Sequence, residues 1–171
     1  MRVTKDFFFG IERVFEHHYF ERIEDVALEH EPRSILVCMD AGRTPFDRLK
    51  PLAHRLLDSG GVFFCCYGYA AKMTHDAVDW VRAELDIHEY ELGAKRESDA
   101  RIIMTTWHDD ELLEQTVEFW CQYGYPPADW GPVRTWTSVT IGDELSYRKI
   151  QAYTSTRKLT DIELGRVPVD D

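Results

Sequence analysis

The fold is decided by residues 34–70, which read SILVCMDAGRTPFDRLKPLAHRLLDSGGVFFCCYGYA. Two short apolar runs, at residues 34–40 and 62–70, enclose a longer amphipathic segment. Apolar runs of this length are typical of strands that are buried on both faces, as in a parallel sheet. The stretch therefore predicts two parallel strands that are joined by a crossover helix.

The boundaries of this first helix are marked by its own residues. Thr44 can cap a helix and Pro45 suits the first helical position, while Ser59-Gly60-Gly61 is typical of a helix end. Pro51 lies inside the predicted helix, where it removes a hydrogen-bond donor. It therefore predicts a kink or a second helix start near Lys50.

The same alternation continues towards the C-terminus. Thr74 can cap a helix over residues 75–88, and residues 101–107 are strand-like. A second helix is predicted to follow from residue 109, and residues 133–143 alternate as a fourth strand. The buried stripes of the two helices are predicted to be Ala77, Val78, Val81 and Leu85 in the first, and Leu113, Thr116, Val117 and Trp120 in the second.

The two ends of the chain are assigned from weaker patterns. In residues 1–33, apolar side chains from Phe8 to Val26 recur at steps of three and four, which predicts an amphipathic helix. Residues 144–171 are predicted to begin with a helix, or with a strand if Gly142-Asp143 turns a hairpin, followed by a loose tail. The helix is favoured.

Together these elements predict one α/β domain over residues 1–171, with its sheet core at residues 34–143. The expected architecture has three layers: a mainly parallel, Rossmann- or flavodoxin-like sheet of four to five strands between flanking helices.

Composition limits the classes of partner and compartment. The chain has 20 Lys and Arg against 31 Asp and Glu, a formal net charge of -11, which disfavours nucleic acid and anionic membranes. No apolar stretch is long enough to span a bilayer or to act as a signal peptide. Cys38, Cys65 and Cys66 lie in apolar strand-like runs, as in proteins of a reducing compartment. We therefore expect a cytoplasmic protein.

Chemistry is expected where the predicted strands end, because ligands of open parallel sheets bind at the carboxyl edge. The titratable residues at these positions are Asp40 and Arg43, the segment 69–75, and residues 108–111. A metal site could combine His108 with Asp109 or Asp110, joined by Asp40 or His75. Established metal spacings and nucleotide-binding glycine motifs are missing, so neither a metal nor another cofactor is expected.

Two further enzyme hypotheses rest on the strands themselves. A cysteine hydrolase would use Cys65 or Cys66, but thiols in the middle of an apolar run are normally inert packing. The segment ILVCMDAGRT (35–44) resembles the first motif of haloacid dehalogenase-like phosphatases, which implies Asp40 as the nucleophile. The chain departs from that motif, since Gly42 stands where the family has its acid-base aspartate. The enzyme hypothesis thus uses the catalytic set Asp40, His75, His108 and Asp110.

The segment MTTWHDDE (104–111) has a structural interpretation as well. Carboxylates are stabilising at a helix N-terminus, and Thr106 and Asp109 have the spacing of a capping box. Asp109, Asp110 and Glu111 need no catalytic role under this interpretation, which we favour over a functional one.

The longer segment IIMTTWHDDELLEQTVEFW (102–120) resembles the signature of a small bacterial α/β domain family of uncharacterised function. Its mark is M-T-T-W-H followed by three acids, written M-T-T-W-H-[DE]-[DE]-E. The resemblance extends over about residues 34–141 and supports the α/β fold. It implies no reaction.

The distribution of charge supplies the functional hypothesis. Residues 102–133 contain no Lys or Arg, and the acids of residues 76–91 are opposed by Arg82 alone. If the two helices are neighbours, their acidic faces form one negative surface with interspersed aromatic rings, which suits a basic protein partner. Acidic helix faces are also common on proteins without such partners. The predicted binding residues are Trp107, Asp109, Glu111, Glu114, Glu118, Tyr125 and Trp130.

We therefore expect an acidic protein-interaction module, such as a bacterial immunity or regulatory protein that binds a basic partner, for example a toxin. The alternative is a small hydrolase or phosphoryl-transfer enzyme that acts at the carboxyl ends of the strands. The sequence leaves the oligomeric state open.

Overall fold

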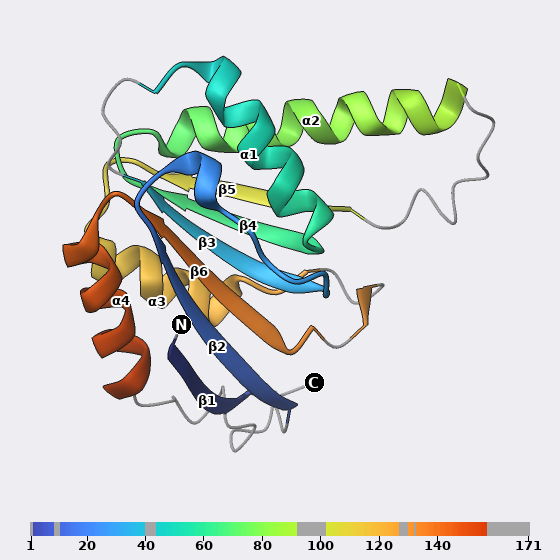
Figure 1. Ribbon diagram of the computed structural model, residues 1–171. Coiled ribbons are helices and arrows are strands. Elements are labelled where there is room, and N and C mark those ends of the chain that lie inside the picture. Colours follow the sequence, from blue (N-terminus) through green and yellow to red (C-terminus); the bar gives the residue numbers. More distant parts are fainter. Residues whose placement is uncertain are drawn as a thin grey trace.

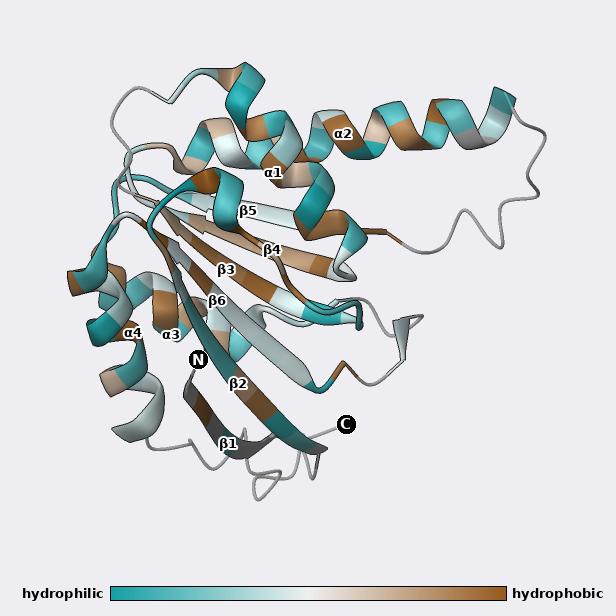
Figure 2. Ribbon diagram, viewed as in Figure 1, coloured by the Kyte–Doolittle hydropathy of each residue, from teal (hydrophilic) through white to brown (hydrophobic). Residues whose placement is uncertain are grey.

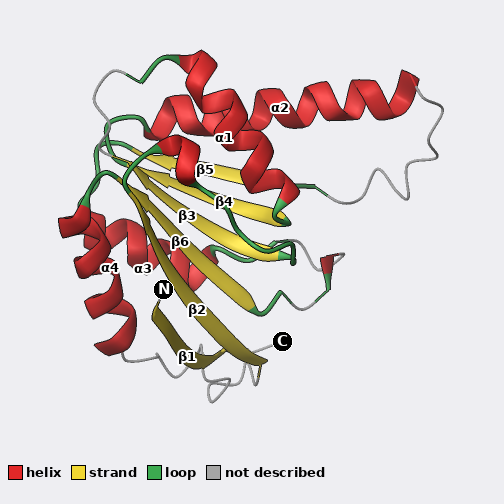
Figure 3. Ribbon diagram, in the orientation of Figure 1, coloured by secondary structure: helices red, strands yellow, loops and turns green. Residues whose placement is uncertain are grey.

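A six-stranded sheet forms the middle layer of the protein, with helices on both of its faces (Figures 1 and 3). The computed structural model describes residues 2–8, 11–39, 44–91, 102–126, 130–131 and 133–156. Its strands are β1 (Arg2–Phe8), β2 (Ile11–Phe20), β3 (Arg33–Met39), β4 (Gly61–Tyr67), β5 (Met104–His108) and β6 (Thr135–Ile141). Its helices are α1 (Phe46–Asp58), α2 (Ala71–Glu91), α3 (Leu113–Tyr123) and α4 (Glu144–Thr156), with a short 3-10 turn, η1 (Ile23–Asp25).

The sheet has the strand order β1-β2-β6-β3-β4-β5. Neighbouring strands from β2 to β5 are all parallel, and β1 alone pairs in the antiparallel direction, with β2. The predicted three-layer, mainly parallel α/β fold is therefore confirmed. The sheet is wider than predicted because the N-terminal segment contributes strands to it.

The N-terminal helix predicted for residues 1–33 is wrong, because residues 2–8 and 11–20 are the strands β1 and β2. The buried face of β2 carries the polar side chains of Arg13 and His17 on either side of Phe15. Both side chains have partners: Arg13 donates to the Cys121 carbonyl (2.6 Å), and the His17 ring bonds Ser138 (2.8 Å). Polar residues at buried positions concealed the strand alternation.

Two apolar clusters hold the layers together, one on each face of the sheet. The first joins the sheet to α1, α2 and η1, and the second joins it to α3 and α4. Every residue of β3 and β6 is buried, and apolar residues concentrate along β3 and β4 (Figure 2). The predicted stripe of α3 is buried, as are Ala77, Val78 and Val81 of the α2 stripe, while Leu85 is partly buried.

Two predicted helix starts are corrected. A single helix, α1, runs through Pro51, so no second start occurs near Lys50. The carbonyl that loses its donor there belongs to the exposed Asp47, where water can replace it. The second helix, α2, begins at Ala71 and not after Thr74, whose N–H already bonds the Ala70 carbonyl (2.9 Å).

The favoured helix after Asp143 is confirmed as α4, whereas the predicted tail from residue 157 lies outside the described residues. Asp143 caps α4, because its carboxylate accepts the Ser146 N–H (3.0 Å). Among the described helices, none has the length and apolar character needed to cross a membrane.

The buried side chain of Arg33 connects several elements by hydrogen bonds. Its guanidinium is only 2% exposed, and it bonds the Glu16 carboxylate (3.3 Å), the Thr137 hydroxyl (2.9 Å) and the Glu29 carbonyl (2.5 Å). Its Nε also donates to the Ser59 carbonyl (3.3 Å). One side chain thus links β2, β6, the end of α1 and the loop before β3.

Replacing this side chain tests its structural role. We expect Arg33→Ala to lower the free energy of unfolding by about 3 kcal/mol or more, because the substitution leaves buried partners unsatisfied. Urea denaturation followed by tryptophan fluorescence measures the change. Arg148→Ala is the control: it breaks the exposed Arg148–Glu144 pair and should have no measurable effect. A loss below about 1 kcal/mol for Arg33→Ala would contradict the assignment.

Candidate functional site

The carboxyl ends of β3, β4 and β5 lie side by side at one edge of the sheet, as predicted. Cys38 pairs with Tyr67, and Tyr67 pairs with His108, so the loops that follow these residues leave from one edge. Asp40, Gly42 and Arg43 lie outside the described residues. Strand order reverses between β3 and β6, which is where ligands bind in folds of this kind.

The side chains at the end of β5 point alternately to the two faces of the sheet. Thr105 and Trp107 face α2, because Thr105 donates to Asp79 (2.8 Å) and the Trp107 ring lies 4.7 Å from that of His75. His108 faces α3, with its ring 4.7 Å from that of Phe119. Neighbouring strand residues point to opposite faces. The two histidines of the predicted catalytic set are therefore separated by the sheet.

His108 has a complete set of structural contacts. It is 7% exposed, and its Nδ1 bonds the Glu111 carboxylate (2.9 Å) while its Nε2 bonds the Thr106 hydroxyl (3.2 Å). These contacts fix the turn that leads from β5 towards α3. The ring therefore lies between a hydroxyl and a carboxylate at this turn, and little of it is exposed.

The predicted helix cap at this turn is wrong. The helix α3 begins at Leu113, so Asp109, Asp110 and Glu111 precede its first turn. The cap uses Gln115, whose side-chain oxygen accepts the Leu112 N–H (3.1 Å). Asp109, Asp110 and Glu111 therefore do not cap the helix. The N-cap position is occupied by an exposed leucine, Leu112.

His75 lies between two carboxylates of its own helix. Its Nδ1 is 3.1 Å from Asp76 and its Nε2 is 3.5 Å from Asp79. Asp110, the remaining described member of the catalytic set, is exposed. Within the described ranges, no three His, Cys, Asp or Glu side chains converge as metal ligands would.

The acidic residues of α2 are largely paired. Asp76 bonds Lys72 (3.0 Å), Asp86 bonds Arg82 (2.6 Å), and Glu84 receives the Trp80 N–H (2.6 Å). The hydrogen bond from Trp80, with the one from Lys50, lowers the pKa of Glu84. Moreover, α2 and α3 cover opposite faces of the sheet (Figure 1). The continuous acidic surface predicted from the two helices therefore does not form.

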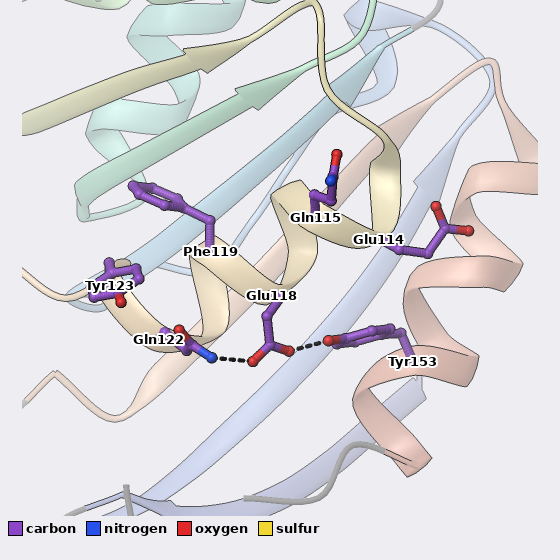
Figure 4. A pocket seen from close by; sticks show the side chains of 7 residues that line it. All are labelled: Glu114, Gln115, Glu118, Phe119, Gln122, Tyr123 and Tyr153. Atoms are coloured by element: carbon purple, nitrogen blue, oxygen red, sulfur yellow. Dashed lines mark hydrogen bonds between the residues drawn. The ribbon is translucent and has the colours of Figure 1, made fainter. Parts of the chain in front are cut away.

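A separate acidic groove lies between α3 and α4 (Figure 4). Its volume is about 460 Å³, and its lining residues are Glu114, Gln115, Glu118, Phe119, Gln122, Tyr123 and Tyr153. The Glu118 carboxylate accepts hydrogen bonds from the Tyr153 hydroxyl and from the Gln122 amide. Glu114 lies 3.7 Å from Lys149 of α4 in an exposed pair. Two of the predicted binding residues are thus brought together.

The other predicted binding residues do not line this groove. Trp107 is 47% exposed on β5, Tyr125 is 44% exposed after α3, and the Trp130 N–H donates to the Ile102 carbonyl (2.9 Å). Asp109 is exposed at the carboxyl edge, and Glu111 bonds His108. The predicted set is therefore spread over several surfaces.

The sequence interpretation missed five groove residues: Gln115, Phe119, Gln122, Tyr123 and Tyr153. The first four share the helix of Glu118, and their spacing of one to five residues from it was a signal that they lie nearby. No comparable signal existed for Tyr153, because its place beside α3 depends on where α4 packs.

The four cysteines are free and buried. Burial raises the pKa of the Cys65 and Cys66 thiols, and neither thiol bonds a histidine among the described residues. A thiolate is the reactive form of cysteine. The geometry therefore supports packing roles for these side chains.

A family model described as "Domain of unknown function (DUF7684)" matches residues 15–157. This agrees with the resemblance to an uncharacterised α/β family. None of the curated proteins matches the chain.

Thiol accessibility can be measured directly. We expect the native protein to react with Ellman's reagent only at the slow rate of its unfolding, and to release four equivalents in denaturant, because all four thiols are buried. A thiol that reacts within seconds under native conditions would contradict this expectation and would revive the cysteine hydrolase hypothesis.

The role of His108 can be measured through stability. We expect His108→Ala to lower the free energy of unfolding by about 1–3 kcal/mol, because it removes two hydrogen bonds and a ring contact. Asp110→Ala, two residues away at an exposed position, should leave stability unchanged. Equal stabilities of the two variants in urea denaturation would show that the bonds of His108 do not hold the turn.

Proposed function

This chain belongs to the family described as a domain of unknown function (DUF7684), and from that premise we propose that it is an acidic protein-interaction module. It binds a basic partner protein through the groove between α3 and α4. A toxin is one such partner, which would make the chain an immunity protein; a regulated basic protein is another. Four free cysteines are consistent with a cytoplasmic location.

The observation that carries this proposal is the lining of the groove. Two carboxylates, Glu114 and Glu118, and three aromatic rings line it, and no Lys or Arg does. Aromatic rings supply apolar contact and attract cations over their faces, while carboxylates pair with the charge. An arginine or lysine side chain of a partner fits this combination of groups.

Glu118 is prepared for such a partner by its neighbours. The Tyr153 hydroxyl and the Gln122 amide hold its carboxylate in place without neutralising it (Figure 4). A fixed carboxylate loses less conformational freedom on binding than a mobile one. Glu114 at the rim is paired with the exposed Lys149, and a pair of this kind is readily exchanged for a partner's cation.

Binding is favoured over the small hydrolase or phosphoryl-transfer alternative by the placement of the described catalytic candidates. His75 and His108 face opposite sides of the sheet, and His108 is buried with both nitrogens bonded. General acid–base chemistry requires such groups within hydrogen-bond reach of one substrate.

The proposal is tested with a defined basic probe. A ten-residue peptide of arginine and leucine is titrated into the ¹⁵N-labelled protein, beside a control peptide with glutamate for arginine. We expect saturable shifts of amide resonances centred on Glu114–Tyr123 and Tyr153, from the arginine peptide alone. Glu114→Gln with Glu118→Gln should weaken binding about tenfold or more, as loss of close charge pairs does.

The matched control is Asp47→Asn, which removes one negative charge on α1, at the opposite face of the sheet. It should leave the affinity nearly unchanged, and circular dichroism should show all variants folded. Shifts centred on α2 or β5, or equal weakening by Asp47→Asn, would show that net charge alone attracts the peptide and would overturn the groove assignment.

A further inference from the structure

The helix α4, which forms one wall of the α3–α4 groove, buries few apolar side chains. Of its residues, all of which the structure describes, Ser146 and Ile150 are buried. Ile150 belongs to the apolar cluster beneath α3 and α4, and Tyr153 packs partly against that cluster. With so little apolar burial, the position of this helix depends in part on its polar contacts.

The last turn of α4 is held in two directions by neighbouring residues. The Tyr153 hydroxyl donates to the Glu118 carboxylate of α3, inside the groove (Figure 4). The Thr154 hydroxyl lies 3.0 Å from Nε2 of His17, on β2. Because Tyr153 and Thr154 are adjacent on one helical turn, a shift of Thr154 relative to the sheet also moves the Tyr153 hydroxyl relative to Glu118.

The ring of His17 is fully buried between two hydroxyls. Its Nδ1 lies 2.8 Å from the Ser138 hydroxyl of β6, and its Nε2 faces Thr154. The one hydroxyl proton of Thr154 is donated to the Ile150 carbonyl (3.0 Å), which leaves its oxygen to accept the Nε2–H of His17. Nδ1 then accepts the Ser138 proton. The three side chains thus form a chain of hydrogen bonds from β6 through β2 to α4.

We propose that His17 is a positioning residue of the α3–α4 groove. Through Thr154, it holds the end of α4 where the Tyr153 hydroxyl meets Glu118, and it thereby raises the affinity of the groove for a cation. A Glu118 carboxylate that is held in place loses less freedom on binding. His17 is not among the residues that line the groove, so it acts on a partner through α4. This inference rests on the proposed binding function of the groove.

The test removes the Thr154 hydroxyl and measures the affinity of the full chain for the arginine–leucine peptide. Thr154→Val keeps the shape of the side chain without its hydrogen bond to His17, and we expect it to weaken binding about fivefold, as loss of one hydrogen bond does. Thr154→Ser retains the hydroxyl and should restore the affinity. Thr156→Val is the matched control, because this exposed hydroxyl bonds carbonyls of its own helix, and it should leave the affinity nearly unchanged.

A double-mutant cycle shows whether the effect passes through Tyr153. We expect Tyr153→Phe to weaken peptide binding by itself. In that background Thr154→Val should have little further effect, because the hydroxyl that it positions is missing. The proposal is overturned if the two substitutions are fully additive, if Thr154→Val binds as the unaltered chain does, or if Thr156→Val weakens binding equally.

Two resonances of the peptide-free protein separate a failure of this inference from a failure of the groove. The ring ¹⁵N signals of His17 report which nitrogen is protonated, and the ¹³Cζ signal of Tyr153 reports its bond to Glu118. We expect Thr154→Val to shift both signals and Thr156→Val to shift neither. If the unaltered chain does not bind the peptide, the groove function fails, while shifts of both signals still support the positioning of Tyr153 by His17. A Tyr153 signal that Thr154→Val leaves unchanged overturns that positioning, whatever the peptide does.

Discussion

The pairing of β6 between β2 and β3 is the constraint on which the rest of the structure depends. This strand hydrogen-bonds to β2 through Val14↔Thr135 and to β3 through Arg33↔Thr135, and every one of its residues is buried. Its central position joins the N-terminal hairpin to the remaining strands. The connections on both sides of this strand, α3 and α4, cover the face opposite α1 and α2 and form the α3–α4 groove.

The sequence was sufficient to predict a strand or helix where that element buries an apolar stripe of its own. The elements β3, α1, β4, α2 and α3 follow this rule, and their order predicts the parallel sheet. In β5 the one buried residue is His108. The sequence was insufficient at β2, where Arg13 and His17 occupy the buried face. Their partners, the Cys121 carbonyl and Ser138, lie more than a hundred residues further along the chain. Buried polar residues of this kind can be recognised as part of a strand only after the strand order is known.

The candidate sites, like the fold, could be predicted from the sequence only in part. The carboxyl edge of β3 to β5 follows from parallel strand ends, and Glu114 and Glu118 stand out because α3 lacks basic residues. The hydrogen bond from Tyr153 to Glu118 could not be predicted, because it depends on where α4 packs beside α3. The acids of α2 and α3 appear equivalent in a charge count. In the fold they lie on opposite faces, and Asp76, Glu84 and Asp86 of α2 pair with Lys72, Lys50 and Arg82.

The late position of β6 in the chain also has a consequence for biosynthesis. A ribosome releases the β1–β2 hairpin and then β3, β4 and β5 before it releases the strand that connects them. Until then, the edges of β2 and β3 that later receive β6 have unpaired backbone groups, which are a template for wrong pairing with other nascent chains. Residues 135–141 cover both edges at once when they enter the sheet, so the central strand of the native sheet is among the last to be synthesised.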